Sequence, residues 1–166
     1  GKTTFALHFL YSGATLYDEP GIYVSLDESP RDVLRNYSGF DWDLEELEKK
    51  EKLLLLDASL FKSISRVMKI PSINKTTTDK EYSLVTLSNL IKGTVEKTGA
   101  KRVVIDPMST LIFQYPDPQE RRLAVMELLT SLRAQTDCTS LIIMDLRVST
   151  LEREYQMEEY LTHGTI

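Results

Sequence analysis

Apolar residues at helical spacing open the chain and return several times along it. Phe5, Phe9 and Leu10 recur with a period of about 3.6 residues, and Gly13 follows where such a helix would end. This pattern predicts a first helix over about residues 2–14. Further helices are predicted from Pro30 onward and over residues 43–52, 84–95 and 123–132.

Short continuous apolar runs separate these helices. They cover residues 22–26, 53–58, 102–106 and 139–145. Such runs are typical of strands buried on both faces, and strands that alternate with helices form parallel sheets through right-handed crossovers. We therefore expect one α/β domain with a mostly parallel sheet and helices on both faces. Residues 59–80 show no clear period, and we expect a long loop or inserted segment there.

Acidic residues follow three of the predicted strands. Asp27 and Glu28 end the run "IYVSLDE", Asp106 ends "RVVID", and Asp145 ends "TSLIIMD". Ligands of open parallel sheets bind at the carboxyl ends of the strands. The four acids therefore mark the edge at which we expect a functional site.

The first residues, "GKTT", match the end of a phosphate-binding loop. Gly1, Lys2 and Thr3 fit the last three positions of G-x-x-x-x-G-K-[ST]. They open a predicted helix, whose N-terminus directs backbone N–H groups and a positive dipole end at an anion. Lys2 would reach the β- and γ-phosphates of a nucleotide, and the Thr3 hydroxyl would ligate Mg²⁺. The alternative is a chain end whose lysine is merely solvated.

The strand-end acids fit the remainder of a nucleotide site. An aspartate that ends an apolar strand commonly supplies a second protein group for Mg²⁺, a position that Asp106 would fill. Asp27 and Glu28 end another strand, where a carboxylate would orient or deprotonate an attacking water. Alternatively, either of these two acids caps the helix that begins at Pro30.

Composition narrows the class of protein. The chain has 166 residues, a net charge of −5 and one cysteine, Cys138. The acidic balance argues against attraction of the whole surface to nucleic acid or anionic membranes. A single cysteine excludes an internal disulfide framework and fits a reducing compartment. No apolar segment approaches the roughly 20 residues of a membrane span, so we expect a cytoplasmic protein without a membrane partner.

Taken together, these motifs resemble a known family. The runs "GKTTFALHFLYSGATLYDEPGIYVSLDESPRDVLRN", "GFDWDLEELEKKEKLLLLDAS", "AKRVVIDPMSTL" and "EEYLTHGTI" are similar to the KaiC-like branch of the RecA superfamily of P-loop ATPases. The resemblance covers nearly the whole chain and is weakest over residues 61–82. It implies a RecA-like P-loop NTPase core that is truncated at both ends, with the first strand and later strands lying outside residues 1–166.

The resemblance also assigns roles to individual residues. The phosphates of ATP would be held by Gly1, Lys2, Thr3 and Thr4. Mg²⁺ would be served by Thr3 and Asp106, and the adjacent catalytic carboxylates would be Asp27 and Glu28. Asp145 falls near a position that senses the γ-phosphate.

Two departures from the family pattern bear on turnover. Asp27 stands where the family commonly has glutamate, and Pro107 follows Asp106 where serine is usual. The first hypothesis is a Mg²⁺-dependent ATPase that hydrolyses ATP as an oligomeric regulator or motor. The alternatives are a nucleotide-bound signalling scaffold with slow or no hydrolysis, and a DNA-dependent recombinase or helicase.

The resemblance implies a homo-oligomer, a hexameric ring with ATP between subunits. Basic residues that act in trans would lie after Ile166, and the isolated fragment would bind nucleotide poorly. A partner protein is compatible with the pattern. Nucleic acid is less favoured, although the irregular segment has a basic character, with Lys62, Arg66, Lys69, Lys75 and Lys80.

Overall fold

The computed structural model describes residues 1–59, 79–112, 115, 117–134, 137–145, 162–164 and 166. The irregular segment expected over residues 59–80 falls almost entirely outside this part of the chain. Of its basic residues, only Lys80 belongs to the described part, near the start of a helix over Asp79–Thr98.

Within the described residues, the sheet has four strands. They are β1 (Gly21–Ser25), β2 (Leu53–Asp57), β3 (Arg102–Asp106) and β4 (Thr139–Ile142). Their order across the sheet is β2-β1-β3-β4, and all three neighbouring pairs are parallel. The expected parallel α/β sheet is confirmed.

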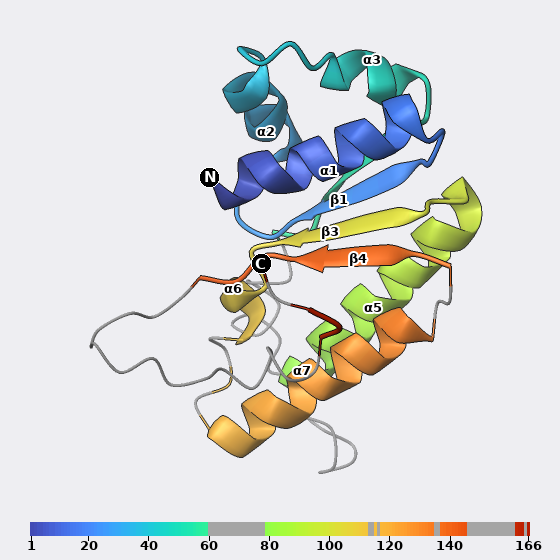
Figure 1. Ribbon diagram of the computed structural model, residues 1–166. Coiled ribbons are helices and arrows are strands. Elements are labelled where there is room, and N and C mark those ends of the chain that lie inside the picture. The colour runs from blue at the N-terminus through green and yellow to red at the C-terminus, as the bar shows by residue number, and fades with distance from the viewer. Residues whose placement is uncertain (60–78, 113–114, 116, 135–136, 146–161, 165) are drawn as a thin grey trace.

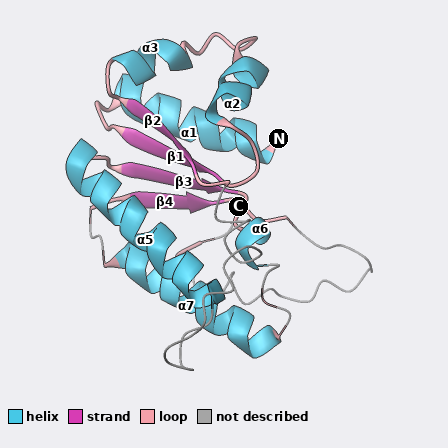
Figure 2. Cartoon of the chain, turned by 180° about the vertical axis from the view of Figure 1, so that it is seen from behind, coloured by secondary structure: helices cyan, strands magenta, loops and turns pink. Residues whose placement is uncertain are grey.

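Helices cover both faces of this sheet, as the sequence predicts (Figures 1 and 2). One face carries α1 (Lys2–Leu16), α2 (Pro30–Tyr37) and α3 (Leu44–Lys49). The opposite face carries α5 (Asp79–Thr98) and α7 (Pro118–Arg133). A short helix that the sequence pattern does not predict, α6 (Ser109–Ile112), lies at the carboxyl edge after β3.

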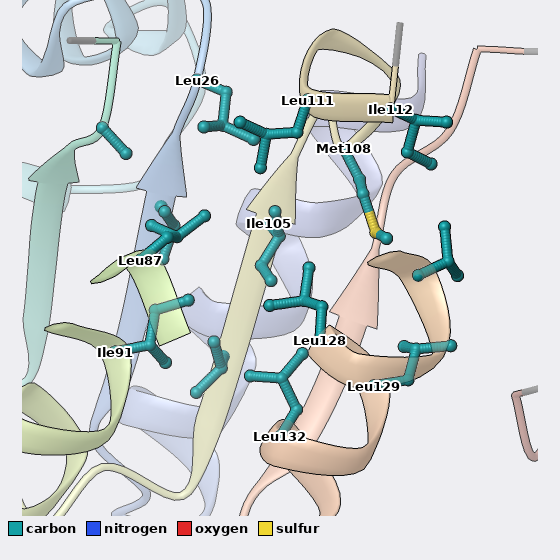
Figure 3. Close-up of a cluster of buried hydrophobic side chains, with 14 of the residues drawn as sticks. Leu26, Leu87, Ile91, Ile105, Met108, Leu111, Ile112, Leu128, Leu129 and Leu132 are labelled. Carbon is teal, nitrogen blue, oxygen red and sulfur yellow. The ribbon is translucent and has the colours of Figure 1, made fainter. Parts of the chain in front are cut away.

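Alternation along β3 decides which side chains reach the site. Val103 and Ile105 belong to the core under α5 and α7, where Figure 3 shows Ile91 and Leu128 gathered beside Ile105. Val104 instead belongs to the core under α1. Since successive strand residues point to opposite faces, Asp106 is directed to the α1 face, on which the helix beginning at Lys2 lies.

The first helix is longer than predicted. It continues past Gly13 to Leu16, so the expected stop at Gly13 is wrong. Gly13 is buried, and an added Cβ would lie 2.5 Å from Cδ of Arg102. The glycine is therefore a point of close approach between α1 and β3, and it does not end the helix.

Candidate functional site

The four parallel strands end together at the carboxyl edge of the sheet. In the parallel register Ser25 is paired with both Asp57 and Asp106, and Ile105 is paired with Ile142. The strands therefore end side by side, and the residues that follow them gather at one edge. Figure 1 shows α1 beginning on this same side of the sheet.

Lys2 forms an ion pair with Asp145 at this edge. Its Nζ lies 2.6 Å from Oδ1 of Asp145 and 2.8 Å from the carbonyl oxygen of Met144. The Ser109 hydroxyl donates to Oδ2 of the same carboxylate at 2.9 Å. Hydrogen bonds from Lys2 and then Ser109 lower the pKa of Asp145. Asp145, expected near a γ-phosphate, thus contacts the lysine assigned to the phosphates.

Asp106 is buried beneath the same edge. The residue is 6% exposed, and its Oδ2 accepts a hydrogen bond of 2.8 Å from the hydroxyl of Tyr23. Burial, followed by the neighbouring Asp106 carboxylate, raises the pKa of Tyr23 far above its ordinary value, so this hydroxyl remains a donor. Among the described residues, no side chain or backbone group donates to Oδ1 of Asp106.

The adjacent acids Asp27 and Glu28 follow β1 and are exposed. The Thr110 hydroxyl donates to Oδ1 of Asp27 at 2.9 Å, and Nδ2 of Asn36 donates to Oε2 of Glu28 at 3.1 Å. Neither acid caps α2. That position belongs to Ser29, whose hydroxyl accepts from the backbone N–H of Asp32 at 3.2 Å.

The remaining phosphate-loop residues lie at the start of α1. Gly1 is the N-cap residue and is exposed, while Thr3 and Thr4 are half-buried in the first turn. The helix start therefore presents the expected residues at the edge where the strand-end acids gather.

The donor set at this edge suits Mg²⁺ bound together with a nucleotide. Mg²⁺ prefers oxygen ligands and is commonly held by one or two protein groups plus substrate phosphates. Asp106 offers a buried carboxylate oxygen without a donor in the described part of the chain, and Thr3 offers a hydroxyl. No group of three or more histidine, cysteine or acidic side chains that could hold a metal by itself occurs in the described residues, at this edge or away from it, so the phosphates would have to supply the remaining ligands.

Four residues that contact the acids were not identified from the sequence: three with hydroxyl groups, and Asn36 of α2, which donates to Glu28. Tyr23 lies within an apolar strand run, where a tyrosine is expected to pack. Ser109 and Thr110 lie in a four-residue helix, which is too short to leave a periodic pattern. In these three residues the only sequence signal for a polar contact was the hydroxyl group itself, and the acid that accepts from it is distant in sequence.

One sequence expectation concerned membranes. In the part of the chain that the structure describes, no helix combines the length and apolar character that a membrane span requires.

Comparison with known proteins identifies the family. The family model described as "ATPase: KaiC" matches residues 1–166. The circadian clock oscillator protein KaiC of Prochlorococcus marinus (strain MIT 9313) is 33% identical over 174 residues, which cover 100% of this chain and 31% of that protein. The KaiC of Parathermosynechococcus lividus is 41% identical over 118 residues, which cover 71% of this chain and 20% of that protein.

A solved structure agrees with the sequence comparisons. The crystal structure of a KaiC-like protein from the hyperthermophilic archaeon Pyrococcus horikoshii OT3 matches with a TM-score of 0.70 and 30% identity. The match covers 97% of this chain and 62% of that one. This chain thus spans a minor part of the curated relatives, 31% and 20% of their lengths. The RecA-type fold and the expected relationship are both confirmed, and the chain belongs to the KaiC ATPase family.

Proposed function

We propose that the protein binds ATP with Mg²⁺ and hydrolyses it to ADP and phosphate. The observation that carries this proposal is the meeting of Lys2, Asp106 and the Asp27–Glu28 pair at one edge of a parallel sheet. Relatives named as KaiC and the matching KaiC ATPase family support it.

Lys2 and the first turn of α1 would bind the phosphates. The ammonium group of Lys2 neutralises oxygens of the β- and γ-phosphates, while backbone N–H groups after Gly1 donate to them. The Thr3 hydroxyl and the Asp106 carboxylate would hold Mg²⁺, which neutralises charge that develops on the phosphates. Asp145 would have to share or release Lys2 when a phosphate approaches, because the two groups are in direct contact.

Asp27 and Glu28 would act on the attacking water. A carboxylate in this position orients the water and accepts its proton as the bond to phosphorus forms. Thr110 fixes one oxygen of Asp27, and Asn36 fixes one oxygen of Glu28. The backbone of Glu28 is fixed too, since its N–H donates to the Ser25 hydroxyl at 3.2 Å.

Lys2→Ala in the full-length protein tests the assignment. Loss of a charge-assisted contact worth about 1.5–3 kcal/mol lowers ATP affinity by about ten- to a hundredfold and removes phosphate release. Lys52→Ala is a matched control, because Lys52 pairs with Asp18 at the opposite end of the sheet and should leave ATP binding unchanged. Unchanged binding and turnover in Lys2→Ala would refute the proposal.

A second candidate is a nucleotide-bound switch with little turnover. Asp27 is one methylene shorter than glutamate and is held by Thr110, an arrangement that favours a poorly placed water. In that case the wild-type protein binds ATP tightly but releases no measurable phosphate, and Asp27→Glu raises release without changing affinity. Measurable release by the wild type favours the ATPase.

We further propose a hexameric ring with ATP between subunits. A cation supplied in trans accelerates phosphoryl transfer by about 10³–10⁵ in systems that use an arginine finger. The basic residues that the resemblance assigns to this role would lie after Ile166. Light scattering with Mg²⁺ and a non-hydrolysable ATP analogue tests the ring. A monomer with normal hydrolysis at every concentration would contradict shared sites.

A further inference from the structure

A tyrosine on β1 contacts the acid assigned to Mg²⁺. The hydroxyl of Tyr23 donates a 2.8 Å hydrogen bond to Oδ2 of Asp106, and the two residues are 2% and 6% exposed. Tyr23 lies opposite Val104 in the β1–β3 register, two positions before Asp106. Because residues two apart on a strand share a face, Tyr23 and Asp106 both lie on the α1 face of the sheet.

Packing alone does not account for the hydroxyl. The ring of Tyr23 belongs to the apolar core under α1. A phenylalanine would fill the same space without placing a hydroxyl in an apolar environment, which is unfavourable unless the group is hydrogen-bonded. The partner of this hydroxyl is a carboxylate located 83 residues away in sequence. The contact therefore joins β1 to the acidic end of β3.

The two oxygens of Asp106 have different surroundings. Oδ2 is held by Tyr23, whereas Oδ1 has no donor among the described residues. A carboxylate with one oxygen held keeps a single orientation. Partners that hold a ligating carboxylate in this way commonly alter metal affinity when they are removed.

We propose that Tyr23 is a positioning residue for Mg²⁺, an inference that rests on the proposed function. Its hydroxyl holds Oδ2 of Asp106 and thereby presents Oδ1 as the metal ligand. Tyr23 does not touch the nucleotide in this assignment; it acts through Asp106.

Tyr23→Phe in the full-length protein isolates the hydroxyl. Binding of a fluorescent, non-hydrolysable ATP analogue is followed while Mg²⁺ is titrated. The Mg²⁺ concentration for half-maximal enhancement of binding rises about tenfold or more, as is typical when a partner of a metal ligand is removed. Affinity measured in EDTA stays unchanged, because Lys2 and the start of α1 are intact. Tyr17→Phe, at the far end of α1 and 65% exposed, is the matched control and leaves both quantities unchanged.

A double-mutant cycle shows whether the effect passes through Asp106. In an Asp106→Asn background the carboxylate is gone, so Tyr23→Phe should produce no further change in Mg²⁺ dependence. Thermal unfolding of each variant, recorded without nucleotide, shows whether the fold is retained. A tenfold effect that persists in the Asp106→Asn background would overturn the proposal.

The outcomes separate this inference from the proposed function. If the wild-type protein shows no Mg²⁺-dependent binding of the analogue, the proposed function fails. If the wild type depends on Mg²⁺ and Tyr23→Phe has the same dependence, only the positioning role is refuted. Equal weakening of binding with and without Mg²⁺ assigns Tyr23 a structural role and likewise refutes positioning.

Discussion

Removing the charge of Asp145 should tighten ATP binding. In Asp145→Asn the side chain keeps its size, and its amide oxygen still accepts from Ser109, but the ion pair with Lys2 is lost. Phosphates then no longer compete with a carboxylate for Lys2. The variant also removes a negative charge from the edge at which a polyanion is expected to bind.

The structure limits the size of this effect. The side chains of Lys2 and Asp145 are 53% and 55% exposed, so the pair belongs to the class of surface ion pairs. Such pairs contribute about 0.2–1 kcal/mol because water and salt screen them. That free energy corresponds to a gain in ATP affinity of about 1.4- to fivefold.

Equilibrium titration of the full-length protein with a non-hydrolysable ATP analogue provides the assay. The gain in affinity should shrink as ionic strength rises, because salt screens exposed charges. Asp137→Asn is a matched control, since Asp137 pairs with Lys101 at the amino end of β3, 3.7 Å apart. Weaker binding in Asp145→Asn would refute the competition and indicate that Asp145 supports the γ-phosphate directly.

The same ion pair sets a pH dependence of stability. Lys2 and Ser109 lower the pKa of Asp145 below its ordinary value of 3.8. A carboxyl group whose pKa is lower in the folded than in the unfolded protein stabilises the fold at pH values above its unfolded pKa. This contribution is lost as the pH falls through the lowered pKa of the folded protein. Urea unfolding should therefore show a constant stability difference between wild type and Asp145→Asn from about pH 5 to 8. A difference that varies across this range would contradict the assignment.

Two further variants test contacts at opposite ends of the sheet. Thr110→Val removes the donor to Asp27 and should lower the rate of phosphate release about tenfold at unchanged ATP affinity. Thr110→Ser retains the hydroxyl and should retain the wild-type rate. Equal rates in the two variants would contradict a role for the hydroxyl. Gly13→Ala should destabilise the protein by about 1–2 kcal/mol in urea unfolding, because the new Cβ would lie 2.5 Å from Arg102; a gain in stability would show that Arg102 moves away freely.

The sheet and the edge of the site could be predicted because their signals are local. The run "RVVID" carries both its burial and its terminal acid within five residues, and β3 has these bounds. Pro30 likewise predicts the start of α2 from its own geometry, and the structure confirms that position, with Ser29 before it as the cap. Predictions from such local patterns are reliable because no distant residue is needed to interpret them.

The errors and omissions arise from contacts between distant segments. Glycine often ends a helix, but α1 continues past Gly13. Arg102 packs against this glycine and donates to the carbonyl oxygen of Phe9 at 2.7 Å, a contact between distant segments that the local pattern does not show. The contact of Tyr23 with Asp106 could not be predicted, because its hydrogen-bond partner lies on another strand, 83 residues away. Asp145 was placed at the correct edge, yet its pairing with Lys2 depends on segments 143 residues apart.

The pairing of β1 with β3 has a consequence for how the chain folds. Residues of the site that lie on or beside these strands, such as Tyr23 and Asp106, are 83 positions apart, and closing a chain segment of that length costs about 4 kcal/mol of entropy, apart from a constant term. Parallel pairing offers no short hairpin that could offset this loss step by step. Asp106 and Tyr23 therefore come together only when the two halves of the chain have docked, so nucleotide binding should appear during refolding together with closure of the sheet.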